Sequence, residues 1–133
     1  MKKSSQQLVD EASAQIETLP VDQARSLLES DGILFIDLRE RGELRREGKI
    51  PGALSVPRGL LEFWVDPESP YYNPAFAGNP KLVLFCAMGW RSALAAKTLQ
   101  DMGLDNVCHI AGGFTAWRHS GAPVEGDRQV ERD

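Results

Sequence analysis

The chain has 133 residues, of which 42% are apolar and 26% charged, with a formal net charge of −4 at pH 7. This length and balance predict one globular domain with a self-sufficient core. The acidic charge argues against a general binder of nucleic acids or anionic membranes. The two cysteines and two histidines are too few for a disulfide framework or a cysteine-rich zinc site. The sequence shows neither a secretory signal nor a run of the ~20 apolar residues that span a membrane, so we expect a cytoplasmic protein.

Helical patterns come first along the chain. Apolar residues at i, i+4 and i+8 within residues 6–16 predict a docked surface helix, and Pro20 closes this segment. A second helix is expected after Val21. The first helix could cover an apolar patch or mediate a homodimer. We divide the chain into an N-terminal helical extension (residues 1–20), a main domain (21–124) and a polar C-terminal tail (125–133).

Four short apolar runs are candidate strands. Residues 33–36 and 82–85 are apolar without alternation, which is typical of strands buried on both faces of a parallel sheet. Residues 106–110 form a third candidate and residues 53–56 a shorter fourth. A helical pattern over residues 91–102, between two of these strands, indicates crossover units and a layered α/β domain.

Residues 57–80 form a long connection for so small a domain, and they include five prolines and several aromatic residues. Long ordered loops are disproportionately functional. We favour a proline-stiffened crossover whose aromatic side chains fill the core, with a lid or a partner surface as the alternative.

The segment after residues 82–85 carries the candidate chemistry. Cys86 ends a strand, a short loop with Gly89 follows, and a helix is expected to begin near Arg91. Ligands bind at the carboxyl ends of parallel strands. A loop that returns to a helix N-terminus directs several backbone N–H groups into one concavity, which suits an anion. Cys86 is expected at the floor of this bowl.

Thiol chemistry needs this environment. A free cysteine has a pKa near 8.5 and is only a few per cent thiolate at neutral pH. Lowering that value by about two units takes ~2.7 kcal/mol, which a helix terminus, converging N–H groups and the Arg91 guanidinium can supply together. No histidine lies near Cys86 in the sequence, and a thiol activated by its cradle would not need one. An inert buried cysteine is the alternative, and we expect that role for Cys108.

Four segments, taken in order, resemble one family. They read FIDLRE (residues 35–40), GKIPGA (48–53), CAMGWR (86–91) and IAGGF (110–114) followed by Trp117. Together they are similar to the single-domain rhodanese-like (thiosulfate sulfurtransferase) family over about residues 21–124. The resemblance implies a single α/β domain in which helices flank both faces of a parallel five-stranded sheet.

The resemblance also implies a reaction and a set of site residues. Cys86 would attack thiosulfate or a persulfide donor, carry the sulfur as a persulfide, and pass it to cyanide or a thiol. Asp37 and Arg39 would brace the site, or else form a turn-stabilising surface pair. No metal or organic cofactor is implied. The expected partners are a small anionic donor, the acceptor and a sulfur-relay protein. The expected substrate-binding residues are Ala87, Met88, Gly89, Trp90, Arg91 and Ser92.

Some residues depart from the family pattern or leave alternatives open. Ala87 stands where thiosulfate-using members often carry a basic residue, which favours a protein persulfide as donor, and Lys49 replaces a turn histidine. Met88 and Trp90 could shape the pocket mouth, dock an acceptor protein or pack against the aromatic crossover. The alternative functions are a non-catalytic binding module and, less favoured, a cysteine phosphatase or arsenate reductase. Cysteine phosphatases of similar fold have five residues between the cysteine and the arginine, and this sequence has four.

Overall fold

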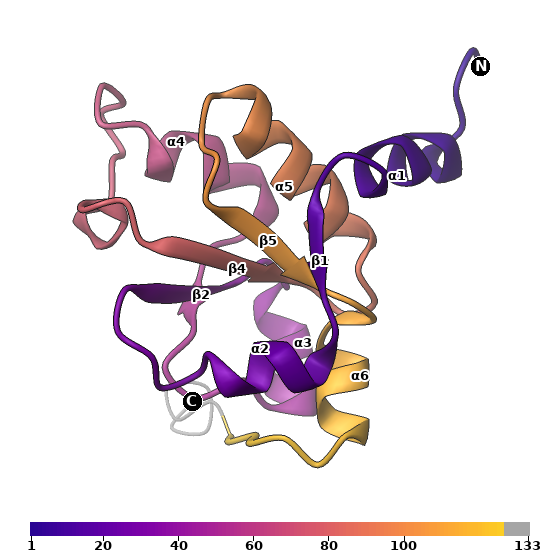
Figure 1. Cartoon of the computed structure of the whole chain (residues 1–133), viewed down its shortest axis with the longest axis vertical. Coiled ribbons are helices and arrows are strands. Elements are labelled where there is room, and N and C mark those ends of the chain that lie inside the picture. The colour runs from indigo at the N-terminus through magenta and orange to yellow at the C-terminus, as the bar shows by residue number, and fades with distance from the viewer. Residues whose placement is uncertain (127–133) are drawn as a thin grey trace.

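The computed structural model describes residues 1–126 and is built around a five-stranded sheet in the order β1-β5-β4-β2-β3 (Figure 1). Every pair of neighbouring strands in this sheet is parallel. The predicted fold class, a parallel five-stranded α/β sheet in one domain, is confirmed. The strands are β1 (Glu17–Leu19), β2 (Ile33–Asp37), β3 (Leu54–Ser55), β4 (Lys81–Phe85) and β5 (Val107–Ile110).

Helices cover both faces of the sheet (Figure 1). One face carries α4 (Leu61–Val65) and α5 (Trp90–Asp101), and α1 (Ser5–Ser13) packs against α5. The other face carries α2 (Val21–Ser26), α3 (Arg41–Glu47) and α6 (Gly113–His119). Within residues 1–126, no helix is long and apolar enough to cross a lipid bilayer.

The central strand β4 is buried on both faces, which explains its unbroken apolar sequence. Leu82 and Leu84 pack into the core beneath α4 and α5. Val83 and Phe85 face the opposite way, into a core that includes Trp117 of α6. Neighbouring residues of a strand point to opposite faces, so a strand between two helical layers needs apolar residues at every position.

The N-terminal segment joins the sheet. The helical interpretation of residues 1–20 holds for Ser5–Ser13, but Glu17–Leu19 instead form the edge strand β1. Thr18 pairs with His109 of β5, and Leu19 pairs with Ile110. Three residues are too few to show a strand pattern, so this element is defined by its pairing with β5.

Helix α3, between β2 and β3, was not expected from the sequence. Leu44 is its one buried residue, so the helix lacks the apolar stripe from which helices are predicted. Glu43 stabilises its first turn, because a side-chain oxygen of Glu43 accepts a hydrogen bond from the backbone N–H of Glu40 at 2.7 Å.

The long connection at residues 57–80 contributes to the core, and part of it is exposed. Leu61, Val65 and Phe76 fill the core, as the favoured interpretation requires. Phe63 and Tyr71 are exposed and contact each other edge to face, with ring centroids 6.5 Å apart. Two short 3-10 turns, Arg58–Leu60 and Pro74–Phe76, shape this segment around α4.

The chain returns to the domain after α6. Within the predicted polar tail of residues 125–133, the backbone of Glu125 forms an antiparallel bridge with Lys49, through hydrogen bonds of 2.8 and 2.9 Å. Glu125, which the sequence analysis placed in the tail, is therefore bound to the domain. Residues 127–133 lie outside the described part of the chain.

Candidate active site

Cys86 follows the central strand β4 directly and lies beside the first turn of α5. The loop between them turns at Gly89, whose φ of 105° lies in the left-handed region that favours glycine. Helix α5 begins at the next residue, Trp90. The sequence predicted this position for Cys86, at the carboxyl end of a buried parallel strand.

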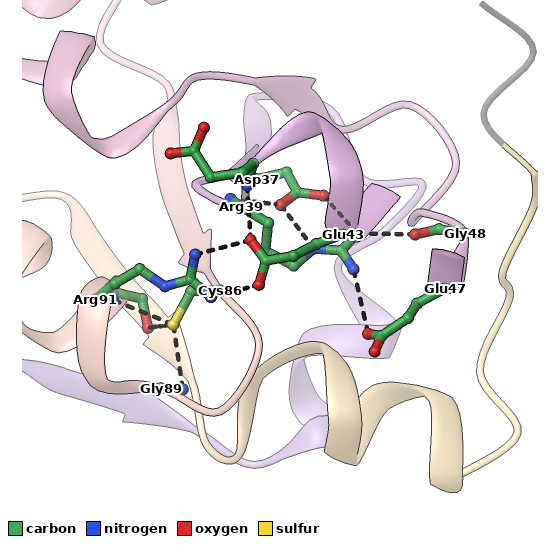
Figure 2. A network of polar contacts seen from close by, with 10 residues as sticks. Asp37, Arg39, Glu43, Glu47, Gly48, Cys86, Gly89 and Arg91 are labelled. Carbon is green, nitrogen blue, oxygen red and sulfur yellow. Dashed lines mark hydrogen bonds and ion pairs between the residues drawn. The ribbon is translucent and has the colours of Figure 1, made fainter. Parts of the chain in front are cut away.

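Three polar groups converge on the sulfur of Cys86 (Figure 2). The backbone N–H groups of Gly89 and Ser92 donate to Sγ at 3.2 and 3.4 Å, and the Ser92 hydroxyl oxygen lies 3.6 Å from it. Only 1% of Cys86 is exposed, so the sulfur is not at the floor of an open bowl, as the sequence analysis expected. The loop closes tightly around one sulfur atom and shields it from bulk water.

Helix α6 holds the other side of the loop. The N–H of Phe114 donates to the carbonyl oxygen of Cys86 at 2.8 Å, and the N–H of Thr115 donates to that of Ala87 at 3.0 Å. Gly113 permits this approach, because a Cβ there would lie 2.6 Å from the Cys86 carbonyl oxygen. Gly113, the first residue of α6, therefore lets this helix hold the cysteine loop in position.

The outer surface of the loop is apolar and exposed. Met88 is 69% exposed and Trp90 is 51% exposed. Neither side chain is buried in the core. Both are instead available to an incoming molecule beside the buried sulfur.

Arg91 is held by a carboxylate that the sequence analysis did not single out. Its two terminal nitrogens donate to the two carboxylate oxygens of Glu43 at 2.8 and 2.9 Å (Figure 2). This bidentate contact lowers the pKa of Glu43 to about 2 and raises the pKa of Arg91, to which the nearby Cys86 sulfur also contributes. Glu43 lies three residues after Glu40, a spacing typical of a helix start.

Asp37 and Arg39 form a buried ion pair behind the loop (Figure 2). Each residue is 1% exposed, so the surface-pair interpretation is wrong. The Arg39 side chain donates to both carboxylate oxygens of Asp37 at 2.9 and 3.0 Å and to the carbonyl oxygen of Gly48 at 2.8 Å. Its guanidinium also stacks 3.9 Å from the ring centroid of Phe114. The pair therefore packs against the residue whose N–H binds the Cys86 carbonyl.

A histidine that is distant in the sequence lies close to the site. His109 Nδ1 is 2.8 Å from the Ser92 hydroxyl oxygen, and its Nε2 is 3.1 Å from the hydroxyl oxygen of Thr18. The residue is 5% exposed, and burial lowers its pKa. The role of His109 was not predicted, because it lies 23 positions after Cys86 in the sequence. Pairing of β5 with β4 brings it to the site.

Cys108, the neighbour of His109 in β5, points to the opposite face of the sheet. It is fully buried among the apolar side chains near α6, and burial raises the pKa of its thiol to about 11. Its prediction as a core residue is confirmed. Within residues 1–126, no three His, Cys, Asp or Glu side chains are grouped so that they could hold a metal ion.

Comparison with known proteins identifies the family. The Rhodanese-like domain model matches residues 20–120, and the chain belongs to this family. The mouse thiosulfate sulfurtransferase/rhodanese-like domain-containing protein 3 is 34% identical over 98 residues, which cover 70% of this chain and 62% of the mouse protein.

Two solved structures extend the likeness to three dimensions. A Rhodopseudomonas palustris protein of unknown function, described as a possible tyrosine phosphatase, is 50% identical with a TM-score of 0.90, and the match covers 94% of this chain and 96% of that one. The polysulfide-sulfur transferase homodimer of Wolinella succinogenes is 30% identical with a TM-score of 0.68, and the match covers 90% and 85% of the two chains.

Proposed function

We propose that this protein is a sulfurtransferase in which Cys86 takes sulfane sulfur from thiosulfate or a persulfide donor and passes it to a thiol or cyanide. One observation carries the proposal: the N–H groups of Gly89 and Ser92 and the Ser92 hydroxyl converge on the Cys86 sulfur. Hydrogen bonds to an anion favour the charged form, so this cradle suits a sulfur that is negative in the course of its reaction. Sulfur transferases among the relatives of the chain support the same activity.

The reaction has two balanced steps. In the first, the Cys86 thiolate attacks the sulfane sulfur of the donor, the donor's bond to that sulfur breaks, and the bonding pair leaves with sulfite or the donor thiolate. Cys86 then carries a persulfide with a negative terminal sulfur. In the second step, the nucleophile of the acceptor attacks that terminal sulfur, and Cys86 leaves as the thiolate. The converging N–H groups stabilise the sulfur anion with which each turnover begins and ends.

The charges around the loop favour a persulfide over a small dianion as the donor. Arg91 is already bound at both terminal nitrogens by Glu43, so a bidentate contact with thiosulfate would have to displace this carboxylate. Ala87 adds no positive charge. We therefore expect a thiol persulfide to load Cys86 faster than thiosulfate does at equal concentration.

Intact-mass measurement tests the proposal. Incubation with thiosulfate or with glutathione persulfide should add the mass of one sulfur atom to the wild type, and a reductant should remove it. The Cys108→Ser variant is the matched control and should gain the same mass, because Cys108 is fully buried away from the loop. Cys86→Ser should gain none. Failure of the wild type to gain sulfur from either donor would refute the proposal.

A phosphatase is the second candidate, because the protein from Rhodopseudomonas palustris with 50% identity is described as a possible tyrosine phosphatase. The loop here has four residues between Cys86 and Arg91 and closes on one sulfur atom, which leaves less room for a tetrahedral phosphate. Turnover of an aryl phosphate that is lost in Cys86→Ser would favour this candidate.

A non-catalytic binding module is the remaining alternative. It predicts that Cys86 is alkylated across the pH range as a simple free thiol is. A sulfurtransferase predicts instead that alkylation reaches half of its maximal rate at a lower pH than it does for a free thiol.

A further inference from the structure

A chain of three polar side chains, Ser92, His109 and Thr18, leads away from the Cys86 sulfur, and the reaction above uses only Ser92. It starts at the sulfur, 3.6 Å from Ser92 Oγ, continues over 2.8 Å to His109 Nδ1, and ends 3.1 Å from His109 Nε2 at the hydroxyl of Thr18. Ser92 and His109 are buried, whereas Thr18 lies in the exposed part of edge strand β1. The buried sulfur is thus connected to the surface of the protein through three side chains.

We propose that Ser92, His109 and Thr18 are a proton relay that carries the thiol proton of Cys86 to solvent at the edge of the sheet. This inference rests on the proposed function in so far as sulfur transfer needs the thiolate. It concerns a different event, the loss of a proton from a cysteine of which only 1% is exposed before a donor binds.

The hydroxyl groups of Ser92 and Thr18 and the ring nitrogens of His109 can each donate or accept a hydrogen bond, so the direction of every hydrogen bond in the relay can reverse. This reversal moves the proton. With a thiol at Cys86, the S–H donates to Ser92 Oγ, the Ser92 O–H donates to His109 Nδ1, and the Nε2–H donates to Thr18. When the proton leaves, it passes from sulfur to Ser92, the hydroxyl proton of Ser92 passes to Nδ1, and the Nε2 proton passes to Thr18, which releases one proton to water.

After the proton has left, the hydrogen bonds of the relay stabilise the thiolate of Cys86. The Ser92 hydroxyl now donates to the thiolate, the Nδ1–H donates to Ser92, and the hydroxyl of Thr18 donates to Nε2. One proton has left, one negative charge remains on Cys86, and His109 is neutral in both states with its proton moved from one ring nitrogen to the other. Its burial suits this role, because burial disfavours the imidazolium form.

The surroundings of His109 leave this path undisturbed. From the cysteine loop, Gly89 lies against the ring, where a Cβ would be 4.0 Å from Cε1. The carboxylate of Glu17 precedes Thr18 in β1 and therefore points to the opposite face of the sheet, where it pairs with Lys81 at 2.8 Å. Near the start of α5, the charge of Arg91 is paired with Glu43, as described above. The titratable group that faces His109 through Ser92 is Cys86.

Nitrogen-15 NMR of the His109 ring tests the proposal directly, in Cys108→Ser protein so that Cys86 is the titrating thiol. Ultraviolet absorbance of the thiolate gives the pH midpoint of Cys86. Below this midpoint we expect the proton on Nε2, and above it on Nδ1. In Cys86→Ser the tautomer should stay the same over the whole range. A single tautomer on both sides of the midpoint, or a change that persists in Cys86→Ser, would overturn the relay.

Two variant pairs provide a second readout. Ser92→Ala removes a hydrogen bond to the thiolate and should raise the midpoint of Cys86 by about one to two pH units, whereas Ser92→Thr keeps the hydroxyl and should restore it. Thr18→Val should raise the midpoint less, and Thr18→Ser should not raise it. If the variants fold normally, the same Cys86 midpoint in Ser92→Ala as in Ser92→Thr, and in Thr18→Val as in Thr18→Ser, would count against the relay.

These measurements separate the relay from the sulfurtransferase proposal. A tautomer switch without any gain of sulfur mass would support the relay and refute sulfur transfer. Gain of sulfur mass without a tautomer switch of His109 would support sulfur transfer and refute the relay.

Discussion

The glycine that lies against the cysteine loop gives the sharpest prediction. In Gly113→Ala, the new Cβ would lie 2.6 Å from the carbonyl oxygen of Cys86 and 2.7 Å from that of Ala87. Both are backbone atoms, which cannot rotate away as the end of a side chain can. The variant must therefore move the loop, α6 or both, and the hydrogen bond from Phe114 to the Cys86 carbonyl, 2.8 Å long, should lengthen or break.

The expected loss of unfolding free energy in Gly113→Ala has two contributions. Placing alanine at the φ of +60° found for Gly113 costs ~1–2 kcal/mol. Forcing a methyl group into a closed space adds ~1–3 kcal/mol, so the free energy of unfolding should fall by about 2–5 kcal/mol. A domain of 133 residues has a total of roughly 7–20 kcal/mol. The variant should therefore fold, with a visibly lower stability.

Gly32 supplies the matched control. Its φ is +74°, yet a Cβ there would meet nothing within 4 Å, so Gly32→Ala should lose only ~1–2 kcal/mol. Urea unfolding measures both variants, and the thiolate titration of Cys86 measures the loop. We expect Gly113→Ala to exceed the control by ~1–3 kcal/mol and to shift the Cys86 midpoint, which Gly32→Ala leaves in place. If Gly113→Ala and Gly32→Ala had the same free energy of unfolding and the same Cys86 midpoint, the close approach of Gly113 to the cysteine loop would be refuted.

Three further predictions follow from the charged and buried groups. Asp37→Asn removes the buried charge partner of Arg39 and leaves Glu47, which is more exposed and 3.9 Å away, so it should lower the free energy of unfolding by ~3–5 kcal/mol in urea titrations, and an unchanged stability would contradict the buried ion pair. Because the pKa of Glu43 is lowered from 4.5 to about 2, its contribution to stability is present above pH 4.5 and lost as the pH falls toward 2. The Glu43→Gln variant should lack this loss of stability, and the same steep decline in both proteins would count against the ion pair. Since burial raises the pKa of Cys108 to about 11, iodoacetamide at pH 8 should label Cys86 before Cys108, as peptide mass mapping would show, and preferential labelling of Cys108 would contradict its burial.

The sequence predicted the parts of the fold that have their own pattern. The unbroken apolar runs of β2 and β4 and the alanine-rich α5 could each be recognised locally. Strand β1 could not, because its three residues, Glu17–Leu19, are extended only through their pairing with β5. Helix α3 was missed for a related reason, since Leu44 alone anchors it in the core.

In the active site too, the residues with a local sequence pattern were predicted, and those placed by distant segments were not. The cysteine loop was predicted from consecutive residues, where strand, glycine and helix follow each other. The partners of the loop come from other elements: Glu43 from α3, and His109 from β5. A charged residue and a lone histidine carry no local signal of what they will face, so their roles depend on which strands become neighbours. The burial of Cys86 was likewise hidden, because α6 closes the loop from a distant part of the chain.

The lengths of the strands have a consequence for solubility. The edge strands β1 and β3 have three and two residues, whereas the interior strands have four or five. An exposed sheet edge offers unpaired backbone groups to which another molecule can add a strand, and a very short edge offers few of them. Residues 17–19 thus also act as a cover for β5, and removing the N-terminal segment should expose this strand and promote intermolecular β-pairing.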